Sequence, residues 1–166
     1  MTRVHLICGP TGSGKTTYSF ELAKNIGAAR FSIDEWMQNL YGPDIQDPIE
    51  YQWMIERVNR CETQILYLCK ELIKLKIEIV LDLGFFALAQ RKKFINALQE
   101  FGSMPQLHYL QVNVVTRWER VSARNKDKGD TYSLTVTRGQ FDFCETIFET
   151  PSEEELRHAI KVPEKE

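Results

Sequence analysis

Residues 9–16 read Gly-Pro-Thr-Gly-Ser-Gly-Lys-Thr and match the pattern G-x-x-x-x-G-K-T. Glycines allow successive backbone N–H groups to turn inward around an anion, and the start of a helix brings its positive end to the same place. Lys15 can reach the outer phosphates of a nucleoside triphosphate, and the hydroxyl of Thr16 can bind Mg²⁺. Such a pattern arises by accident in about one chain in two hundred of this length. We therefore predict a phosphate-binding loop, with ATP and Mg²⁺ as its ligands.

The expected nucleotide contacts extend one residue beyond the motif, because the hydroxyl of Thr17 can add a contact to the α-phosphate. Lys15 is also expected to act in catalysis, as a point charge on the β- and γ-phosphates. The complete set of expected contact residues is Gly9, Pro10, Thr11, Gly12, Ser13, Gly14, Lys15, Thr16 and Thr17.

Two aspartates, Asp34 and Asp82, follow short apolar runs that we interpret as strands. The carboxyl ends of parallel strands meet at the crevice where ligands bind. A kinase needs one carboxylate to accept the proton of the attacking hydroxyl and another to hold the metal or its waters. We expect Asp34 to be the base, and Asp82 to bind the metal or the substrate. The alternative is that Asp34 only caps the helix that follows it, although one carboxylate can be both cap and base.

Three arginines, Arg117, Arg120 and Arg124, share one face of a predicted helix. The polar, turn-rich residues that follow are expected to form a mobile lid over about 126–134. A phosphoryl-transfer site needs cations that close over the transferring phosphate, so we predict catalytic roles for Arg120 and Arg124. The role of Arg117 stays open, Arg138 is a weaker candidate, and a solvated helix face is the alternative for the whole set.

The motifs of GTPases are incomplete in this sequence. Residues 82–84 are one residue too short for D-x-x-G, and residues 125–128 place Lys128 where N-K-x-D requires aspartate. Assembly ATPases need a larger domain than 166 residues provide. A small kinase is therefore the class of phosphate-loop protein that we favour.

The elements that must position these residues alternate short apolar runs with helical patterns, which is typical of βαβ units in an α/β fold with a parallel sheet. A long helix opens with Asp47-Pro48-Ile49-Glu50, with Asp47 as cap and Glu50 completing a capping box, and it could break near Asn59. The expected strands are 4–8, 30–33, 77–83 and 107–112, with a possible short fifth near Ile160. The expected helices are 14–26, one from Glu35 capped by Asp34, the long helix to about Leu75, 88–101, 116–125, 136–148 and a short one from Ser152.

Length and composition favour one domain over residues 1–166, with a frayed tail after Pro163. The net charge of −2 argues against a chain that mainly coats nucleic acid or an anionic membrane. No apolar run reaches the roughly 18 residues of a membrane span. None of the four cysteines, Cys8, Cys61, Cys69 and Cys144, forms a C-x-x-C pair, so we interpret them as reduced thiols in a cytoplasmic monomer or weak dimer.

A family resemblance runs through nearly the whole chain. It rests on the phosphate loop with its flanks (residues 8–17), on Phe31-Ser-Ile-Asp-Glu-Trp36, on residues 40–44, on Val80-Leu-Asp-Leu-Gly-Phe85, on residues 107–110, on Arg120-x-x-x-Arg124-Asn125 and on residues 148–153. These segments resemble the P-loop kinases of the AAA_33 / zeta-toxin type. That group is related to the kinase domain of polynucleotide kinase and to chloramphenicol phosphotransferase.

The resemblance implies a three-layer P-loop NTPase fold with the core strand order 2-3-1-4 and a lid after the fourth strand. It also implies that the acid after the second strand, Asp34, is the base for a substrate hydroxyl. Polynucleotide kinases carry an arginine shortly after that acid. Residues 35–38 contain none, which argues against a 3′-phosphate-bearing polynucleotide as acceptor.

Five aromatic residues surround the regions that should form the acceptor side, although several of them, Trp53 and Phe86 above all, could instead belong to the core. They are Trp36, Tyr41, Trp53, Phe85 and Phe86. Aromatic walls suit a ring-containing hydroxyl compound. Our first hypothesis is therefore an ATP-dependent transfer of phosphate to a hydroxyl of a small molecule. The alternatives are a 5′-hydroxyl polynucleotide kinase and an ATP-binding regulatory module without catalysis.

Overall fold

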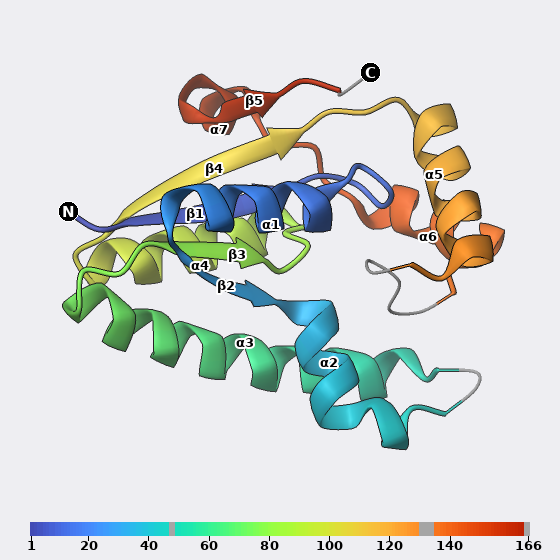
Figure 1. The fold of residues 1–166 in the computed structure, drawn as a ribbon, viewed down its shortest axis with the longest axis horizontal. Coiled ribbons are helices and arrows are strands. Elements are labelled where there is room, and N and C mark those ends of the chain that lie inside the picture. Colours follow the sequence, from blue (N-terminus) through green and yellow to red (C-terminus); the bar gives the residue numbers. More distant parts are fainter. Residues whose placement is uncertain (47–48, 130–134, 165–166) are drawn as a thin grey trace.

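A single five-stranded parallel sheet organises the molecule, and the computed structural model describes residues 1–46, 49–129 and 135–164 around it (Figure 1). The strands are β1 (Arg3–Cys8), β2 (Ala29–Ser32), β3 (Ile79–Asp82), β4 (Met104–Leu110) and β5 (Ile160–Val162). Their order is β2-β3-β1-β4-β5, and every neighbouring pair is parallel. The predicted core order and the short fifth strand are both confirmed.

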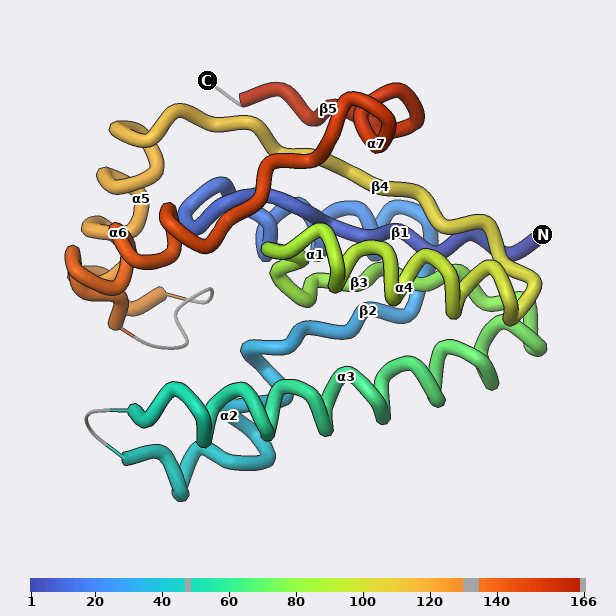
Figure 2. The backbone as a smooth tube through the Cα atoms, turned by 180° about the vertical axis from the view of Figure 1, so that it is seen from behind, coloured from blue at the N-terminus to red at the C-terminus, as the bar shows by residue number. Residues whose placement is uncertain are grey.

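Helices cover both faces of the sheet, as the predicted three-layer fold requires (Figures 1 and 2). Val4, Leu6 and Cys8 of β1 face the larger apolar cluster, to which α3 and α4 contribute, whereas Ile7 faces a smaller cluster on the side of α1. This alternation follows from the two-residue repeat of a strand. The helices are α1 (Lys15–Ile26), α2 (Ile33–Tyr41), α3 (Tyr51–Lys74), α4 (Leu88–Glu100), α5 (Val114–Asp127), α6 (Arg138–Ile147) and α7 (Glu153–His158), with a 3₁₀ turn at Gly42–Asp44.

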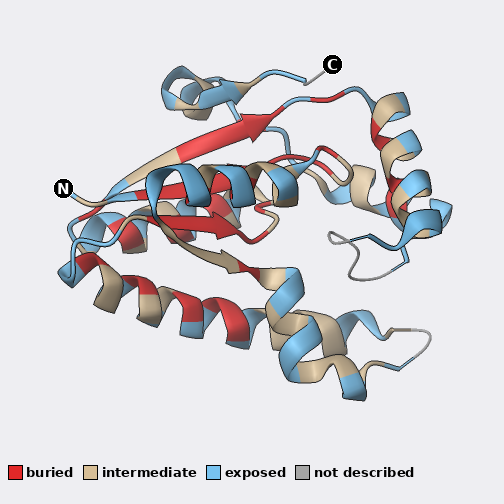
Figure 3. Ribbon diagram, in the orientation of Figure 1, coloured by how far each residue is buried: buried red, intermediate tan, exposed pale blue. Residues whose placement is uncertain are grey.

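The centre of the sheet is buried on both faces (Figure 3). All four residues of β3 are buried, and Leu6 of β1 lies between Leu81 of β3 and Leu107 of β4. Parallel strands that are covered by helices on both sides need such continuous apolar runs. The prediction that the third strand is central is thereby confirmed.

The long helix α3 is continuous, so the break near Asn59 that its length made possible does not occur. Its buried residues include Cys61, Ile65, Cys69 and Ile73, which recur at a spacing of four and form one unbroken stripe. The predicted cap at Asp47 lies outside the described residues. Glu50, which we expected inside the helix, is itself the extended N-cap residue and makes no side-chain capping bond.

Most of the other expected boundaries shift by one to three residues, and the starts of α2 and β4 show the physical reason. The helix α2 begins at Ile33, and Ser32 caps it by accepting a hydrogen bond from the Glu35 amide at 3.5 Å, so the capping role of Asp34 is wrong. The strand β4 begins at Met104 because it pairs with the whole of β1, from Arg3 to Cys8. In the described part of the chain, no helix combines the length and apolarity needed to cross a bilayer.

The predicted lid falls only partly within the described residues. Lys126 and Asp127 form the end of α5, and Lys128 follows with a φ of 46°. Residues 130–134 lie outside the described residues. The start of the tail is described, and Glu164 lies 3.7 Å from Arg120.

Candidate active site

The loop between β1 and α1 depends on glycine at specific positions. Gly12 and Gly14 have φ values of 79° and 91°, which other residues rarely adopt. A Cβ atom at Gly9 would lie 2.6 Å from Ser13 Oγ, and one at Gly12 would lie 2.6 Å from the Arg117 carbonyl oxygen. The buried Ser13 hydroxyl has no hydrogen-bond partner among the described residues. An orphaned buried donor of this kind indicates a place for a polar ligand.

Lys15 curls over this loop. Its Nζ donates hydrogen bonds to the carbonyl oxygens of Gly9 at 2.8 Å and Pro10 at 3.0 Å. It also lies 5.6 Å from the centre of the Phe86 ring. Burial of the ammonium group lowers the pKa of Lys15, while the charges of Asp82 and Asp34 raise it. The lysine is therefore the common cation of the loop and of both predicted carboxylates.

Asp34 lies in the first turn of α2, with its carboxyl group within electrostatic range of Lys15, Asp82 and Arg124. Loss of water around the carboxyl group raises the pKa of Asp34, and the negative charge of Asp82 raises it further. The cations Lys15 and Arg124 act in the opposite direction. A carboxylate with a raised pKa holds a proton more readily, which suits a general base.

Asp82 ends β3 and is buried, with 5% of its surface exposed. Its Oδ2 accepts hydrogen bonds from Ser19 Oγ at 3.2 Å and from Arg30 Nη2 at 3.3 Å. The single hydroxyl proton of Ser19 is shared with a second acceptor, the carbonyl oxygen of Thr16, which lies 2.8 Å from Oγ. The predicted metal ligands Asp82 and Thr16 are thus connected through one buried serine.

Arg30 was missed by the sequence analysis. It extends from β2 and donates to Ser19 Oγ through Nε at 2.8 Å and to Glu35 Oε1 through Nη1 at 2.7 Å. Its guanidinium group lies over the Phe20 ring, 3.8 Å from the centre. The available signal was a charged residue within a short predicted strand.

The three arginines of α5 have different environments. Arg117 is buried and pairs with Glu145 of α6 through two hydrogen bonds of 2.5 and 2.6 Å. It also donates to the carbonyl oxygens of Thr11 at 3.1 Å and Val112 at 3.0 Å. Arg117 therefore braces the phosphate loop against α6, and the solvated-face alternative is wrong for this residue.

Arg120 and Arg124 lie in different surroundings, Arg120 at a cavity beside the loop and Arg124 near Asp34. Arg120 lines a cavity of about 220 Å³ beside the loop, whose other lining residues are Ser13, Gly14, Thr17, Tyr18, Leu110, Val112, Val162, Pro163 and Glu164. Arg124 is the arginine whose charge acts on Asp34. The Nε of Arg124 is buried and has no hydrogen-bond partner among the described residues.

The expected aromatic residues are divided between the core and the site. Phe85 is fully buried and packs edge-on against Phe94 at 5.2 Å between ring centres. Trp36 packs against the core beside Phe31. Phe86, by contrast, lies beside Lys15, as described above.

Tyr41 and Trp53 form a separate cluster on α2 and α3, where Arg57 lies 3.8 Å from the centre of the Trp53 ring.

Arg91, which the sequence analysis also missed, fastens the segment after β3. The residue is fully buried in α4 and donates to the carbonyl oxygens of Phe85 at 3.0 Å and Glu149 at 2.9 Å. It pairs with Glu155 of α7 at 2.6 Å. The segment that carries Phe86 toward Lys15 is therefore fixed by a charged network.

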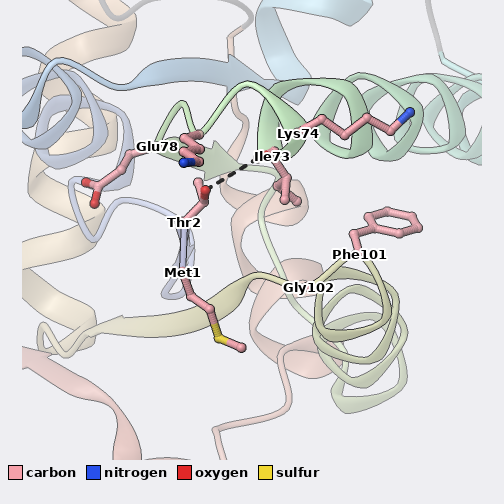
Figure 4. A pocket seen from close by; sticks show the side chains of 8 residues that line it. Met1, Thr2, Ile73, Lys74, Glu78, Phe101 and Gly102 are labelled. Atoms are coloured by element: carbon pink, nitrogen blue, oxygen red, sulfur yellow. Dashed lines mark hydrogen bonds between the residues drawn. The ribbon is translucent and has the colours of Figure 1, made fainter.

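A larger cavity lies at the opposite end of the sheet and contains none of the predicted site residues (Figure 4). Its volume is about 500 Å³. It is lined by Met1, Thr2, Ile73, Lys74, Lys76, Glu78, Phe101 and Gly102. Ligand binding in open parallel sheets occurs at the carboxyl ends of the strands, where the phosphate loop, α2, α5 and α6 gather (Figure 1).

Solved structures with the same fold include a candidate kinase from Chloroflexus aurantiacus. It has a TM-score of 0.74 and 12% identity, with 98% of this chain and 85% of that chain covered. A gluconokinase from Sinorhizobium meliloti has a TM-score of 0.59 and 14% identity, with 98% and 83% covered. The APS kinase of Mycobacterium tuberculosis, in complex with AMPPNP and APS, has a TM-score of 0.66 and 11% identity, with 98% and 88% covered. At these identities the likeness shows the fold.

None of the curated proteins matches the sequence. The family model AAA_33, described as an AAA domain, matches residues 4–151. This match covers the phosphate loop, both aspartates and all three arginines of α5. The chain therefore belongs to the AAA_33 family of P-loop domains.

Proposed function

We propose that the protein is an ATP- and Mg²⁺-dependent kinase that transfers the γ-phosphate to a hydroxyl group of a small molecule. The observation that supports this best is the electrostatic grouping of Lys15, Asp34, Asp82 and Arg124 at the end of the sheet that carries the phosphate loop. This group contains a phosphate-binding cation, a base, a metal ligand and a second cation. Phosphoryl transfer depends mainly on such positioning and on charge neutralisation.

The nucleotide would bind with its phosphates in the loop and its base in the adjoining cavity. Residues 9–17 supply the backbone amides, the Lys15 ammonium and the hydroxyl groups. Arg120 lines the cavity together with Val162 and Pro163, so its planar cation can stack on a base there. We therefore assign Arg120 to nucleotide binding and Arg124 to the transferring phosphate, which divides the roles that the sequence left undivided.

The donor atoms near the loop fit Mg²⁺. Thr16 offers a hydroxyl and Asp82 a carboxylate, and magnesium prefers oxygen ligands and keeps several waters. Oδ1 of Asp82 accepts no hydrogen bond from the described residues, so it remains able to bind a metal or a metal-bound water. No group of three metal-binding side chains occurs in the described part of the chain. The remaining ligands would be phosphate oxygens and water, and the ion would neutralise charge on the phosphates.

Asp34 would act on the acceptor. The acceptor hydroxyl oxygen forms a bond to the γ-phosphorus, and the bond between that phosphorus and the β,γ-bridging oxygen of ATP breaks. Asp34 takes the proton of the acceptor hydroxyl. The products are a phosphate ester and ADP. Lys15 and Arg124 would hold the γ-phosphate and balance its charge during transfer.

A small acceptor is favoured by two observations. The net charge of −2 provides no basic surface excess for a polynucleotide. The structurally similar proteins include a gluconokinase and an APS kinase. A 5′-hydroxyl oligonucleotide is the competing acceptor.

The decisive experiment is mass spectrometry of a metabolite extract incubated with the protein, ATP and Mg²⁺. We expect a new species that is heavier by one phosphate and is missing when D34N replaces the wild-type protein. A 5′-hydroxyl oligonucleotide in a parallel reaction should stay unmodified. Binding of ATP without any phosphorylated product would instead support a regulatory module, and phosphorylation of the oligonucleotide alone would support a polynucleotide kinase.

A further inference from the structure

We propose that Arg30 is a positioning residue that keeps Asp82 oriented and neutralised until the nucleotide brings the metal ion. This inference rests on the proposed function, because it takes Asp82 as a ligand of that ion. Its consequence is that divalent cations bind only together with the nucleotide. Without Arg30, the protein would bind them alone.

The orientation of Asp82 is fixed from one side. Arg30 and Ser19 both donate to Oδ2 of Asp82, at 3.3 and 3.2 Å, and Arg30 also donates to Ser19 Oγ at 2.8 Å. These three side chains close a ring of hydrogen bonds that leaves Oδ1 without a partner among the described residues. The exposed fractions of the Arg30 and Asp82 side chains are 8% and 6%, so solvent screens this ion pair weakly.

The local charges balance only when Arg30 is present. Three carboxylates, from Asp34, Glu35 and Asp82, belong to the same region as the cations of Arg30, Lys15 and Arg124. Arg30 is the cation that touches two of these carboxylates, Asp82 and Glu35. Its removal would leave three carboxylates with two cations and would take the contacting cation from Asp82 and Glu35. A divalent cation is the species that such an excess of carboxylates attracts.

Arg30 also joins the elements that carry the reaction. It reaches from β2 to Ser19 and Phe20 of α1, to Glu35 of α2 and to the end of β3. The fork of the guanidinium group makes these contacts simultaneously, which a lysine at the same position could not do. A lysine would keep the charge but lose the orientation of Asp82.

The test is an electron paramagnetic resonance titration of Mn²⁺, used as a probe for the divalent site, with and without AMPPNP. For the wild-type protein we expect Mn²⁺ binding only when AMPPNP is present. The R30M variant keeps the unbranched apolar stem of the side chain but removes the guanidinium group, and it should bind Mn²⁺ without nucleotide at least ten times more tightly than the wild type. Adding D82N to R30M should abolish this binding. The matched control R157Q removes an exposed arginine of α7 and should leave both titrations unchanged.

The R30K variant separates the neutralisation of Asp82 from its orientation, and it replaces R30M in the test if R30M does not fold. It should show no Mn²⁺ binding without nucleotide, because the positive charge is kept, but about tenfold weaker Mn²⁺ binding with AMPPNP. Equal titrations for the wild type, R30M and R30K would overturn the role of Arg30. A wild-type protein in which AMPPNP does not promote Mn²⁺ binding would contradict the proposed nucleotide and metal site itself, whatever the variants do.

Discussion

At the scale of single residues, the site is defined by how charges are paired. Lys15 contacts the backbone of its own loop and lies within electrostatic range of both aspartates. A bound triphosphate would offer this cation better partners than two carbonyl oxygens, since ionised acceptors form the stronger hydrogen bonds. The loop lysine should therefore contribute to nucleotide affinity before it contributes to transfer.

Replacing Lys15 with alanine should abolish the rise in melting temperature that ATP and Mg²⁺ give the wild-type protein. The reason is that the loop would lose its point charge on the β- and γ-phosphates. Differential scanning fluorimetry with millimolar ATP and Mg²⁺ measures the effect. K24A, which removes an exposed lysine from the same helix, is the control and should keep the wild-type rise. An unchanged rise in K15A would contradict the phosphate-loop assignment.

Replacing Asp34 with asparagine should keep the nucleotide-induced rise and reduce turnover by roughly 10²–10⁴-fold, the usual contribution of a general base. The amide has nearly the same shape but cannot accept the hydroxyl proton. Transfer of label from [γ-³²P]ATP to the acceptor found by mass spectrometry measures the loss. D44N changes an exposed carboxylate in the 3₁₀ turn after α2 and should keep full turnover. Full turnover in D34N would leave Asp34 with no catalytic role.

At the scale of elements, a row of buried hydrogen-bonded side chains connects the sheet to helix α1. His5 of β1 and His108 of β4 lie 2.9 Å apart through their ring nitrogens, and Tyr18 of α1 bonds the other nitrogen of His108 at 2.8 Å. Burial lowers the pKa of His108 to about 4, and burial likewise lowers the pKa of His5. The two histidines are therefore neutral in the folded protein at pH values where they would be protonated in the unfolded chain.

The free energy of unfolding should consequently fall as the pH drops from about 6.5 toward 4. In this interval the unfolded chain binds more protons than the folded protein, so acid favours unfolding. His108 alone can account for up to about 3 kcal/mol of this loss. Urea unfolding at pH 7 and pH 5 measures it, and H108Q should flatten the dependence. H158Q, at an exposed position, should leave the dependence as in the wild type.

A second element-scale prediction concerns the buried pair of Arg91 and Glu155. R91A would leave Glu155 and several carbonyl oxygens without their donor, and breaking a buried pair costs about 3–5 kcal/mol of unfolding free energy. R138A breaks the exposed pair with Asp142 and should cost less than about 1 kcal/mol. Urea unfolding of both variants checks the contrast. Similar losses in the two would mean that Arg91 does not anchor α7.

Local patterns were sufficient for most elements and for the loop. The glycine spacing of residues 9–16 predicts the backbone conformation of the loop, and the alternation of apolar runs predicts the strands and helices. Loop conformation and secondary structure can be predicted in this way because they depend on residues that are close together in the chain. The strand order came from the family resemblance. The contact of Arg30 with Asp82 spans 52 positions and that of Arg91 with Glu155 spans 64. Such pairs depend on which strands and helices become neighbours, and no local pattern encodes them.

The cap of α2 shows the same limit on a smaller scale. Ser32 and Asp34 are both good capping residues, and the sequence does not decide between them. The pairing of Ser32 with Asp82 at the end of β2 makes Ser32 the last strand residue, so the helix begins directly after it. Asp34 then lies in the first turn of α2, where its carboxylate is not needed to cap the helix.

At the scale of the whole molecule, the phosphate loop is tied to distant parts through Arg117. This side chain bonds the carbonyl oxygens of Thr11 in the loop and Val112 after β4, and it pairs with Glu145 of α6. The carbonyl oxygen of Arg117 also lies against Gly12, which leaves no room for a side chain there. Ordering of the loop by a nucleotide should therefore be transmitted to α6.

Binding of AMPPNP and Mg²⁺ should slow amide hydrogen exchange in α6, a helix outside the phosphate loop, as well as in the loop itself. Ligand that binds the folded state raises the free energy of every opening that breaks its site. In R117Q the slowing in α6 should be lost while that in the loop persists, because Gln cannot bridge Thr11 and Glu145. Exchange in the last turn of α3, where Ile73 and Lys74 line the cavity at the opposite end of the sheet, should change little in either protein. Equal slowing of α6 in R117Q and the wild type would mean that this arginine does not carry the coupling.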